Sequence, residues 1–284
     1  MLLIFFMMML STKTKYFLEK PSFLDNPHGW IPHIPFAFYL VEVLKPRLIV
    51  ELGTYSGNAY FAFCQAANHL SPETRCFAVD TWKGDIHVGA YGNEVYERVK
   101  AINEAHFSEI STLLKMPFDD ALSTFADRSI DLLHIDGTHT YEAVSHDFAS
   151  WLPKLNSRGV VLLHDTRVER EGFGVKRFFD EIKSRYPNVE FPFGEGLAVI
   201  CTGDDPPQAI IELISVVARD NFLLKIFEVL GNNILLTRER DLFREEVLKM
   251  RKLTVELNLQ IREKSGEVKK LQKKLQQVRG SRSG

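Results

Sequence analysis

The chain has 284 residues, of which 45% are hydrophobic and 25% charged, and its formal net charge is -2 at pH 7. This length suits one domain of about 200 residues with a full core, plus an extension. The composition is that of a globular protein, and the charge gives no reason to expect a nucleic-acid partner. Three cysteines, Cys64, Cys76 and Cys201, lie in apolar runs without metal-ligand spacing, so we interpret them as core residues of a cytoplasmic protein.

The N-terminal segment, residues 1–34, begins with an apolar run from Met1 to Leu10. This run is too short to span a bilayer and lacks the basic start of a signal peptide. A peripheral membrane contact, a disordered start and a start-codon artefact are the alternatives. Residues 11–34 contain helix-breaking prolines and are expected to be irregular.

Strand and helix patterns alternate through residues 35–204, which we predict to be the main domain. Strands are expected at 47–52, 75–80, 110–115, 130–136, 158–164, 188–193 and 196–201. Helices are expected at 36–45, 57–68, 93–106, 117–126, 140–151 and 172–186. This alternation predicts a doubly wound, Rossmann-like α/β sheet that is mostly parallel and covered on both faces. Only Gly194 and Glu195 separate the last two strands, so a tight hairpin should make the final strand antiparallel.

The most informative stretch is a strand, a glycine turn, a helix and a second strand that ends on Asp80. The turn reads Glu51-Leu52-Gly53-Thr54-Tyr55-Ser56-Gly57. The glycines allow close approach of a ligand, and an acid after the second strand can accept hydrogen bonds from ribose hydroxyls. The third glycine of the dinucleotide fingerprint is missing, whereas Glu51 suits a cationic group such as the amino group of S-adenosylmethionine. An ordinary strand-to-helix turn is the alternative.

Polar residues also follow the fourth and fifth predicted strands. Asp136 and His139 follow the fourth, and His164 and Asp165 follow the fifth. Because the carboxyl ends of parallel strands share one edge, these side chains should converge. Asp136, His164 and Asp165 then suit a divalent cation such as Mg, while His139 or Asp136 is a candidate base for an acceptor hydroxyl. The alternatives are a turn cap at Asp165, a satisfied His164, and an Asp136 that binds the cofactor without metal.

A second polar cluster starts directly after Asp80, with Thr81, Trp82 and a glycine-containing loop. Trp82 could stack on adenine or wall the acceptor pocket, and the loop could close over a ligand. A Trp82 that only covers the sheet edge is the alternative.

The C-terminal part divides into a helical connector, residues 205–237, a predicted coiled coil, residues 238–278, and a predicted disordered tail, residues 279–284. A heptad seam runs through Phe243, Val247, Met250, Thr254, Leu257, Ile261, Lys264, Val268, Leu271, Leu275 and Val278. Thr254 and Lys264 weaken it, and Gly266 costs about 1 kcal/mol in a helix interior. We predict self-association or docking of a partner enzyme here, with a single solvated helix as the alternative.

Residues 35–201 resemble the class I S-adenosylmethionine-dependent methyltransferases, and in particular a bacterial group found with glycan-assembly enzymes. The resemblance rests on the turn at Glu51–Gly57 and on three runs that begin at Val79, His134 and Leu163. It implies a seven-stranded sheet with an antiparallel last strand. It implies that Glu51, Gly53 and Gly57 line the methionine end of the cofactor and that Asp80 holds its ribose. Thr54, Thr81, Trp82 and Asp136 are our further candidates for cofactor contacts. Related metal-dependent enzymes hold a metal at positions matching Asp136, His164 and Asp165, although His164 stands where they have an acid.

The sequence therefore predicts an O-methyltransferase that transfers a methyl group from S-adenosylmethionine to a hydroxyl of a sugar or glycan. Most of its catalysis would come from holding donor and acceptor in register. Two alternatives are an NAD-dependent oxidoreductase and a non-catalytic scaffold that carries a degenerate cofactor domain on a coiled coil.

Overall fold

The computed structural model of the chain describes residues 15–280, with side chains described as far as residue 273. It divides into two compact units, Met1–Leu235 and Leu236–Gly284. The predictions for Met1 to Leu10 and for residues 281–284 lie outside the described residues. Within residues 15–280, the search for a helix long and apolar enough to cross a membrane finds none.

The first unit is built on a seven-stranded sheet with the order β5-β2-β1-β6-β7-β9-β8. Its first five strands in this order are parallel, and β9 is antiparallel to both of its neighbours. The predicted doubly wound sheet with an antiparallel last strand is thus confirmed. The strands are β1 (Leu48–Leu52), β2 (Arg75–Asp80), β5 (Ser111–Lys115), β6 (Ile130–Ile135), β7 (Leu155–His164), β8 (Asn188–Phe191) and β9 (Leu197–Cys201).

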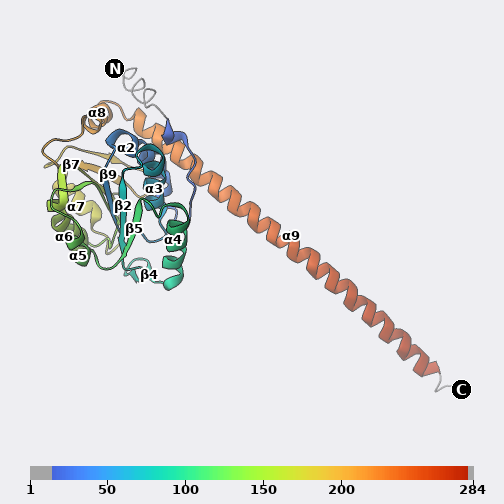
Figure 1. The fold of residues 1–284 in the computed structure, drawn as a ribbon. Helices are drawn as coiled ribbons and strands as arrows, with labels where there is room; N and C mark the ends of the chain where they lie inside the picture. Colours follow the sequence, from blue (N-terminus) through green and yellow to red (C-terminus); the bar gives the residue numbers. More distant parts are fainter. Residues whose placement is uncertain (1–14, 281–284) are drawn as a thin grey trace. The chain divides into compact units, whose positions relative to one another are not determined.

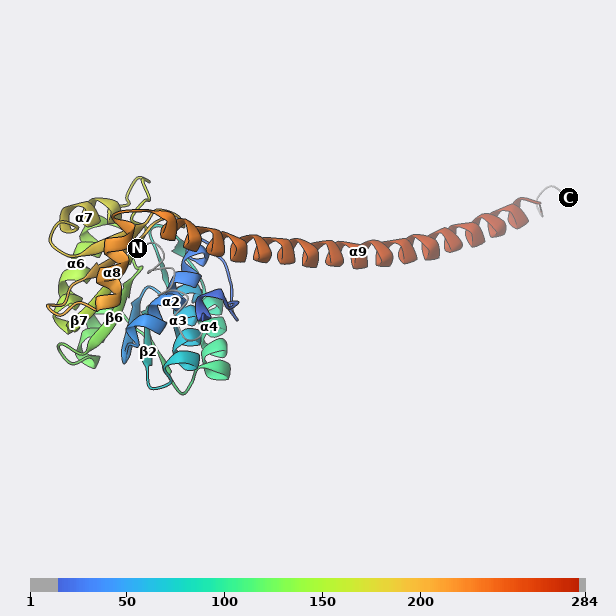
Figure 2. The ribbon, with the colours of Figure 1, turned by 90° about the horizontal axis from the view of Figure 1, so that it is seen from above.

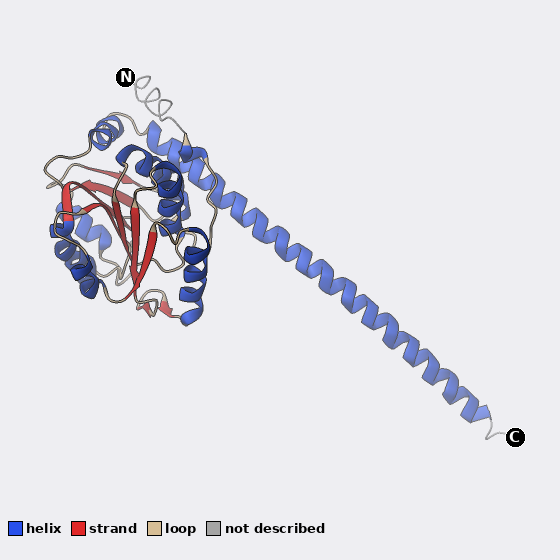
Figure 3. Ribbon diagram, in the orientation of Figure 1, coloured by secondary structure: helices blue, strands red, loops and turns tan. Residues whose placement is uncertain are grey.

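Helices cover both faces of this sheet, as Figures 1 and 2 show. One face carries α2 (Ile34–Leu44), α3 (Asn58–Leu70), α4 (Asn93–His106), α8 (Gln208–Val217) and the start of α9 (Phe222–Gly280). The other face carries α5 (Phe118–Ala121), α6 (Tyr141–Trp151) and α7 (Val175–Ile182). In Figure 3 the strands lie between these two helical layers.

Side-chain alternation along the strands explains why two separate cores form. In β1, Ile49 packs with the α2 and α3 side, whereas Val50 and Leu52 pack with the α6 and α7 side. In β7, Leu162 and Leu163 divide in the same way. A central strand buried on both faces reads as a continuous apolar run, which is the pattern that made these strands predictable.

Several local predictions were wrong in detail. The two-residue hairpin before β9 is a longer loop, residues 192–196, in which Gly194, Glu195 and Gly196 all have positive φ. The predicted helix 117–126 is the short α5 followed by a 3-10 turn, and the predicted helix 172–186 shortens to α7. A small sheet of β3 (Gly84–Asp85) and β4 (Gly89–Ala90) was not predicted.

The predicted helical connector, residues 205–237, is broken between α8 and α9. Asp220 interrupts it, because its Oδ1 accepts a hydrogen bond from the backbone N–H of Phe222 at 2.9 Å, as a helix cap does. From there α9 continues to Gly280, two residues into the segment predicted to be disordered. The predicted C-terminal helix is confirmed, and its pairing into a coiled coil stays a prediction.

Candidate active site

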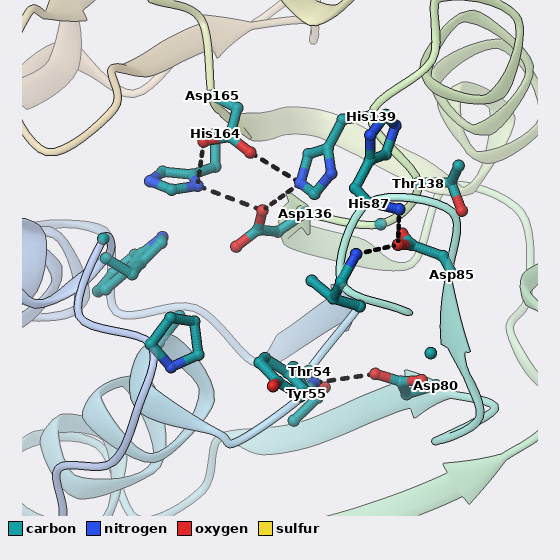
Figure 4. A pocket seen from close by; sticks show the side chains of 18 of the residues that line it. Thr54, Tyr55, Asp80, Asp85, His87, Asp136, Thr138, His139, His164 and Asp165 are labelled. Carbon is teal, nitrogen blue, oxygen red and sulfur yellow. Dashed lines mark hydrogen bonds and ion pairs between the residues drawn. The ribbon is translucent and has the colours of Figure 1, made fainter. Parts of the chain in front are cut away.

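A cavity of about 580 Å³ opens at the carboxyl ends of the parallel strands, where the predicted site residues meet. Ten of its lining residues are labelled in Figure 4, among them Asp80 at one end and Asp136, His139, His164 and Asp165 grouped at the other. The predicted site residues that line this cavity are Glu51, Gly53, Thr54, Asp80, Thr81, Asp136, His139, His164 and Asp165.

Gly57 and Trp82, both predicted as cofactor contacts, are absent from the lining residues. Gly57 has a φ of 87° directly before α3, and a Cβ there would be 2.6 Å from the ring of Phe61. Its part is therefore to let the chain turn into the helix. Trp82 is buried, and its indole Nε1 donates to the carbonyl of Tyr55 at 3.0 Å. It therefore supports the glycine turn and does not line the cavity.

The glycine turn after β1 brings backbone close to the strand end of β6. Gly53 has a φ of 89°, and a Cβ at this position would overlap the carbonyl oxygen of Asp136. Tyr55 follows in the left-handed region with a φ of 46°, which is uncommon for a residue with a side chain. A hydrogen bond from its backbone N–H to Asp80 Oδ2, 2.9 Å long, accompanies this conformation.

Asp80 joins the two loops that border its end of the cavity. Its Oδ2 accepts from Tyr55, and its Oδ1 accepts from the backbone N–H of Trp82 at 2.7 Å. Burial raises the pKa of Asp80, while the backbone hydrogen bonds from Tyr55 and Trp82 act in the opposite direction. Each carboxylate oxygen has a second lone pair, so Asp80 can still accept hydrogen bonds from a pair of hydroxyls.

Glu51 belongs to a buried chain of three side chains. The indole Nε1 of Trp30 donates to His134 Nε2 at 3.1 Å, and His134 Nδ1 lies 2.8 Å from Glu51 Oε1. An indole N–H can only donate, so Nε2 of His134 accepts and Nδ1 carries the proton donated to Glu51. Burial raises the pKa of Glu51, and the hydrogen bond from His134 opposes that change. The other oxygen, Oε2, makes no hydrogen bond of ordinary geometry with the described residues.

Two carboxylates and two imidazoles form a compact cluster at the ends of β6 and β7. His139 Nε2 lies 2.7 Å from Asp165 Oδ2 and 3.5 Å from Asp136 Oδ1. His164 Nδ1 lies 3.2 Å from Asp136 Oδ1 and 3.3 Å from Asp165 Oδ1. Asp165 has a φ of 62°, a left-handed conformation at the strand end that accompanies this geometry. The predicted convergence of these four residues is therefore present.

The cluster favours charged histidines. Burial alone would lower the pKa of His139, but hydrogen bonds to Asp136 and Asp165 raise it to about 10. Burial likewise opposes the charge on His164, and the two carboxylates raise its pKa to about 9. For Asp136, burial acts upward, but the charge of His164 and the hydrogen bonds from both histidines outweigh it and lower the pKa. At neutral pH both histidines are thus protonated and the Asp136 carboxylate is ionised.

A backbone carbonyl fixes the proton on the far side of His164. His164 Nε2 lies 3.0 Å from the carbonyl oxygen of Gly194, and His33 Nε2 lies 2.9 Å from the same oxygen. A carbonyl only accepts, so both Nε2 atoms carry protons. Burial lowers the pKa of His33 to about 3, which keeps His33 neutral. Nδ1 of His164 is thereby directed at Asp136 and Asp165.

Three residues of the cluster have the donor set of a divalent-cation site. Asp136, His139 and Asp165 each offer one ligand atom, and these atoms lie within 4.8 Å of one another. Two carboxylates with an imidazole suit Mg, Mn or a harder transition metal. The sequence had placed His164, rather than His139, in this set. Metal binding stays a prediction.

The comparison with protein families agrees with this geometry. Residues 50–166 match the family model of the methyltransferase domain, a stretch that begins in β1 and ends just after Asp165. Residues 50–166 therefore have the sequence pattern of a methyltransferase domain.

One curated relative of this chain is the uncharacterized protein y4gI from Sinorhizobium fredii (strain NBRC 101917 / NGR234). It is 40% identical over 265 residues, which cover 92% of this chain. The match takes up only 28% of the relative, so the chain spans less than a third of that protein's length.

Solved methyltransferases also resemble the chain at low identity. The SAH-bound methyltransferase PaMTH1 from Podospora anserina has a TM-score of 0.47 at 14% identity, covering 60% of this chain and 77% of that one. The O-methyltransferase TomG from Streptomyces achromogenes, solved with SAM, has a TM-score of 0.46 at 16% identity, covering 64% and 82%. Both scores are below 0.5, so no conclusion about this chain rests on them.

The cavity lining also includes Phe173 and Glu195, which the sequence did not single out. Phe173 stacks on His139 with ring centroids 4.9 Å apart and packs against His87 at 4.3 Å. Glu195, from the loop before β9, pairs with Arg170 at 3.4 Å. These residues come from loops whose partners lie far away in the chain. The glycines on both sides of Phe173 were the only local signal of a close approach.

Proposed function

We propose that this chain is an S-adenosylmethionine-dependent O-methyltransferase whose acceptor is a hydroxyl of a sugar or glycan. The observation that carries the proposal is the placement of carboxylates from three strand ends, Glu51, Asp80 and Asp136, around one cavity. S-adenosylmethionine has an ammonium group, a sulfonium and a ribose diol, so its polar groups complement such a set of acceptors. We propose this methyl-transfer activity for the whole protein as well as for the matched domain.

The residues near Gly53 fit the methionine end of this cofactor. The missing Cβ of Gly53 leaves the backbone open where any side chain would meet Asp136. Glu51 Oε2 is buried without a hydrogen bond of ordinary geometry among the described residues, which is costly unless a ligand supplies a donor. We therefore assign Glu51 to the ammonium group and Asp80 to the ribose hydroxyls.

Methyl transfer is a displacement in which the acceptor oxygen attacks the methyl carbon and the carbon–sulfur bond breaks. The bound cofactor supplies the activated methyl group, and the protein holds donor and acceptor in line. The hydroxyl proton then needs an acceptor. At neutral pH a pKa of about 10 keeps His139 protonated, so His139 acts as a base only after it loses that proton. A carboxylate of the cluster, Asp136 or Asp165, is the alternative acceptor.

A divalent cation held by Asp136, His139 and Asp165 would change this balance. It would replace the proton of His139 Nε2 and lower the pKa of an acceptor hydroxyl next to it. Asp136 and Asp165 would supply negative charge and His139 a neutral imidazole nitrogen, which is a donor set that such a cation prefers.

The acceptor end of the cavity has features that suit a sugar ring. The stacked rings of Phe173 and His139 offer an aromatic face, and Arg170 and Glu195 offer charged hydrogen-bonding groups beside it. An aromatic surface with a few polar groups fixes the orientation of a ligand that has an apolar face and hydroxyl edges. The proposed acceptor remains a class, a hydroxyl-bearing ring, and not a named sugar.

We further propose a cytoplasmic location and a partner that binds through the C-terminal helix. The three cysteines are free and buried, as is usual for proteins of a reducing compartment.

The donor site is tested by calorimetric titration of the full chain with S-adenosylhomocysteine, with NAD as a competing ligand class. Micromolar binding that is lost in Glu51→Gln and Asp80→Asn supports the assignment. Asp131→Asn is a suitable control, since Asp131 lies at the opposite end of β6 and accepts hydrogen bonds from Arg47 and Leu48. Binding of NAD, or of neither ligand by folded protein, would overturn the proposal.

The acceptor class is tested by methyl transfer from methyl-labelled S-adenosylmethionine to sugar hydroxyls in one arm and to catechol in the other. Labelled sugar ethers support the proposal, and transfer to catechol alone contradicts its sugar part. Each arm is run with Mg and with EDTA, which separates a cation requirement from the identity of the acceptor.

A further inference from the structure

We propose that the stalk, defined here as residues 236–280 of α9, pairs with a second copy of this chain as a parallel, in-register, two-stranded coiled coil. The proposal does not depend on methyl transfer. It rests on three independent properties of the stalk: an exposed apolar seam, the residue types along that seam, and the charges beside it.

The seam side chains are exposed in a single copy of the stalk. Phe243, Met250 and Ile261 have exposed fractions of 67%, 57% and 62%. Such large apolar side chains at heptad spacing over some 30 residues have nothing to bury against within the same helix. Four other exposed apolar residues, Leu248, Leu253, Val255 and Leu259, lie off the seam. They form no second seam, because Arg251 and Lys252 occupy the heptad positions between Leu248 and Val255.

The residue types along the seam favour two strands. Between residues 243 and 271, spacing places Val247, Thr254, Ile261 and Val268 at heptad position a, and all four are β-branched; the pattern ends there, because Leu275 follows at a and Val278 at d. Position d is filled by unbranched or γ-branched side chains and one lysine: Phe243, Met250, Leu257, Lys264 and Leu271. β-branched residues at a with leucine-like residues at d favour two-stranded parallel coiled coils, whereas isoleucine at both positions favours larger assemblies.

The charges beside the seam select the parallel orientation. Position g carries Glu239, Glu246 and Glu267, whereas position e carries Arg244 and Arg251. In a parallel pair each g residue meets the e residue five positions later in the other chain, which joins Glu239 to Arg244 and Glu246 to Arg251 twice each. In an antiparallel pair e meets e and g meets g. Each arginine at e would then face an arginine or a neutral residue, and each glutamate at g would face a residue at g instead of an arginine at e.

The Glu246 and Arg251 pair is free to form between chains. Within the described side chains neither residue makes an ion pair, whereas Arg244 lies 3.7 Å from Asp241 of its own helix. Lys264, the one charge on the seam, lies 3.1 Å from Glu267 in the same helix. Its ammonium can therefore point away from the seam while its apolar stem stays beside it.

The first experiment is sedimentation equilibrium of the full chain and of charge variants. Wild type is expected to be a dimer. Glu246→Arg turns two attractive contacts into repulsive ones and should raise the dimer Kd by roughly tenfold to thirtyfold. Adding Arg251→Glu to that variant should restore the wild-type Kd. Glu245→Arg is the matched control, because Glu245 is the adjacent glutamate at the outward position f.

Orientation is tested by mild oxidation of Leu271→Cys. In a parallel in-register pair the two introduced cysteines face each other at one d layer and form a disulfide between chains. An outward Glu263→Cys should not cross-link. A monomeric, trimeric or tetrameric wild type would overturn the proposal, as would a dimer that Leu271→Cys does not cross-link or that Glu246→Arg leaves unchanged.

Discussion

His134 offers the sharpest test of how the cofactor pocket is built. Its ring is fully buried, accepts from Trp30 at 3.1 Å and donates to Glu51 at 2.8 Å. His134→Leu keeps an apolar side chain in the core but leaves the Trp30 indole N–H and one Glu51 oxygen without partners. Each lost partner costs about 1–3 kcal/mol, and more where the group is charged.

Glu51 can reduce this cost by taking up a proton. Burial already raises its pKa, and the loss of the His134 donor would raise it further. At neutral pH the variant would then hold a neutral Glu51, which is a poor partner for an ammonium group. A lost charged hydrogen bond of about 1.5–3 kcal/mol corresponds to roughly tenfold to hundredfold weaker binding of S-adenosylhomocysteine. Binding should recover as pH rises, because the carboxyl ionises above its raised pKa.

The assays are urea unfolding and calorimetric titration at several pH values. The matched control is His146→Leu, because His146 also contacts an aspartate, Asp119, but has a side-chain exposure of 57%. That control should change stability and binding little. Wild-type affinity in His134→Leu, or a stability loss no larger than that of the control, would refute the reasoning.

Three further outcomes are expected. Gly53→Ala should abolish S-adenosylhomocysteine binding and lower the Tm, since its Cβ would overlap Asp136 at a φ of 89°. Binding as strong as that of wild type would contradict the close approach of Gly53 to the Asp136 backbone. Because the folded pKa values of His139 and His164 are raised from 6.5 to about 10 and 9, their contribution to stability is complete below pH 6.5 and lost as pH rises through those values. EDTA-treated wild type should therefore lose more unfolding free energy than His139→Gln across this range in urea titrations. Lys264→Leu should raise the melting temperature of the stalk by circular dichroism, and a decrease would place Lys264 outside the seam.

The sequence predicted the central strands well because β1, β6 and β9 are apolar runs that the sheet buries on both faces. The site residues directly after those strands, such as Asp80, Asp136 and Asp165, were predictable for the same reason, since topology alone brings strand ends together. Trp82 shows the limit, because spacing cannot tell a cavity wall from a side chain that turns back to hydrogen-bond Tyr55.

Contacts between segments far apart in the chain could not be predicted from the sequence. Trp30 reaches His134 across 104 positions, and His33 reaches Gly194 across 161. The left-handed conformation of Asp165 also has no local signature, and it accompanies the geometry that sets the pKa of His139. The sequence thus predicted that His139 would lie near Asp136 and Asp165, whereas its protonation state depends on neighbours that only the fold brings together. Its role as a base stays a prediction.

The carbonyl of Gly194 has a consequence for where this domain can be cut. It accepts hydrogen bonds from His33, which precedes the first strand, and from His164, which ends the fifth strand of the sheet. Trp30, from the same early stretch, supports Glu51 through His134. A truncation that keeps only the family-matched residues 50–166 would retain most of the cavity's acids and bases. It would lose Trp30, which orients His134 beside Glu51, and the Gly194 carbonyl, which orients His164. The smallest active unit should accordingly begin before Trp30 and extend past β9.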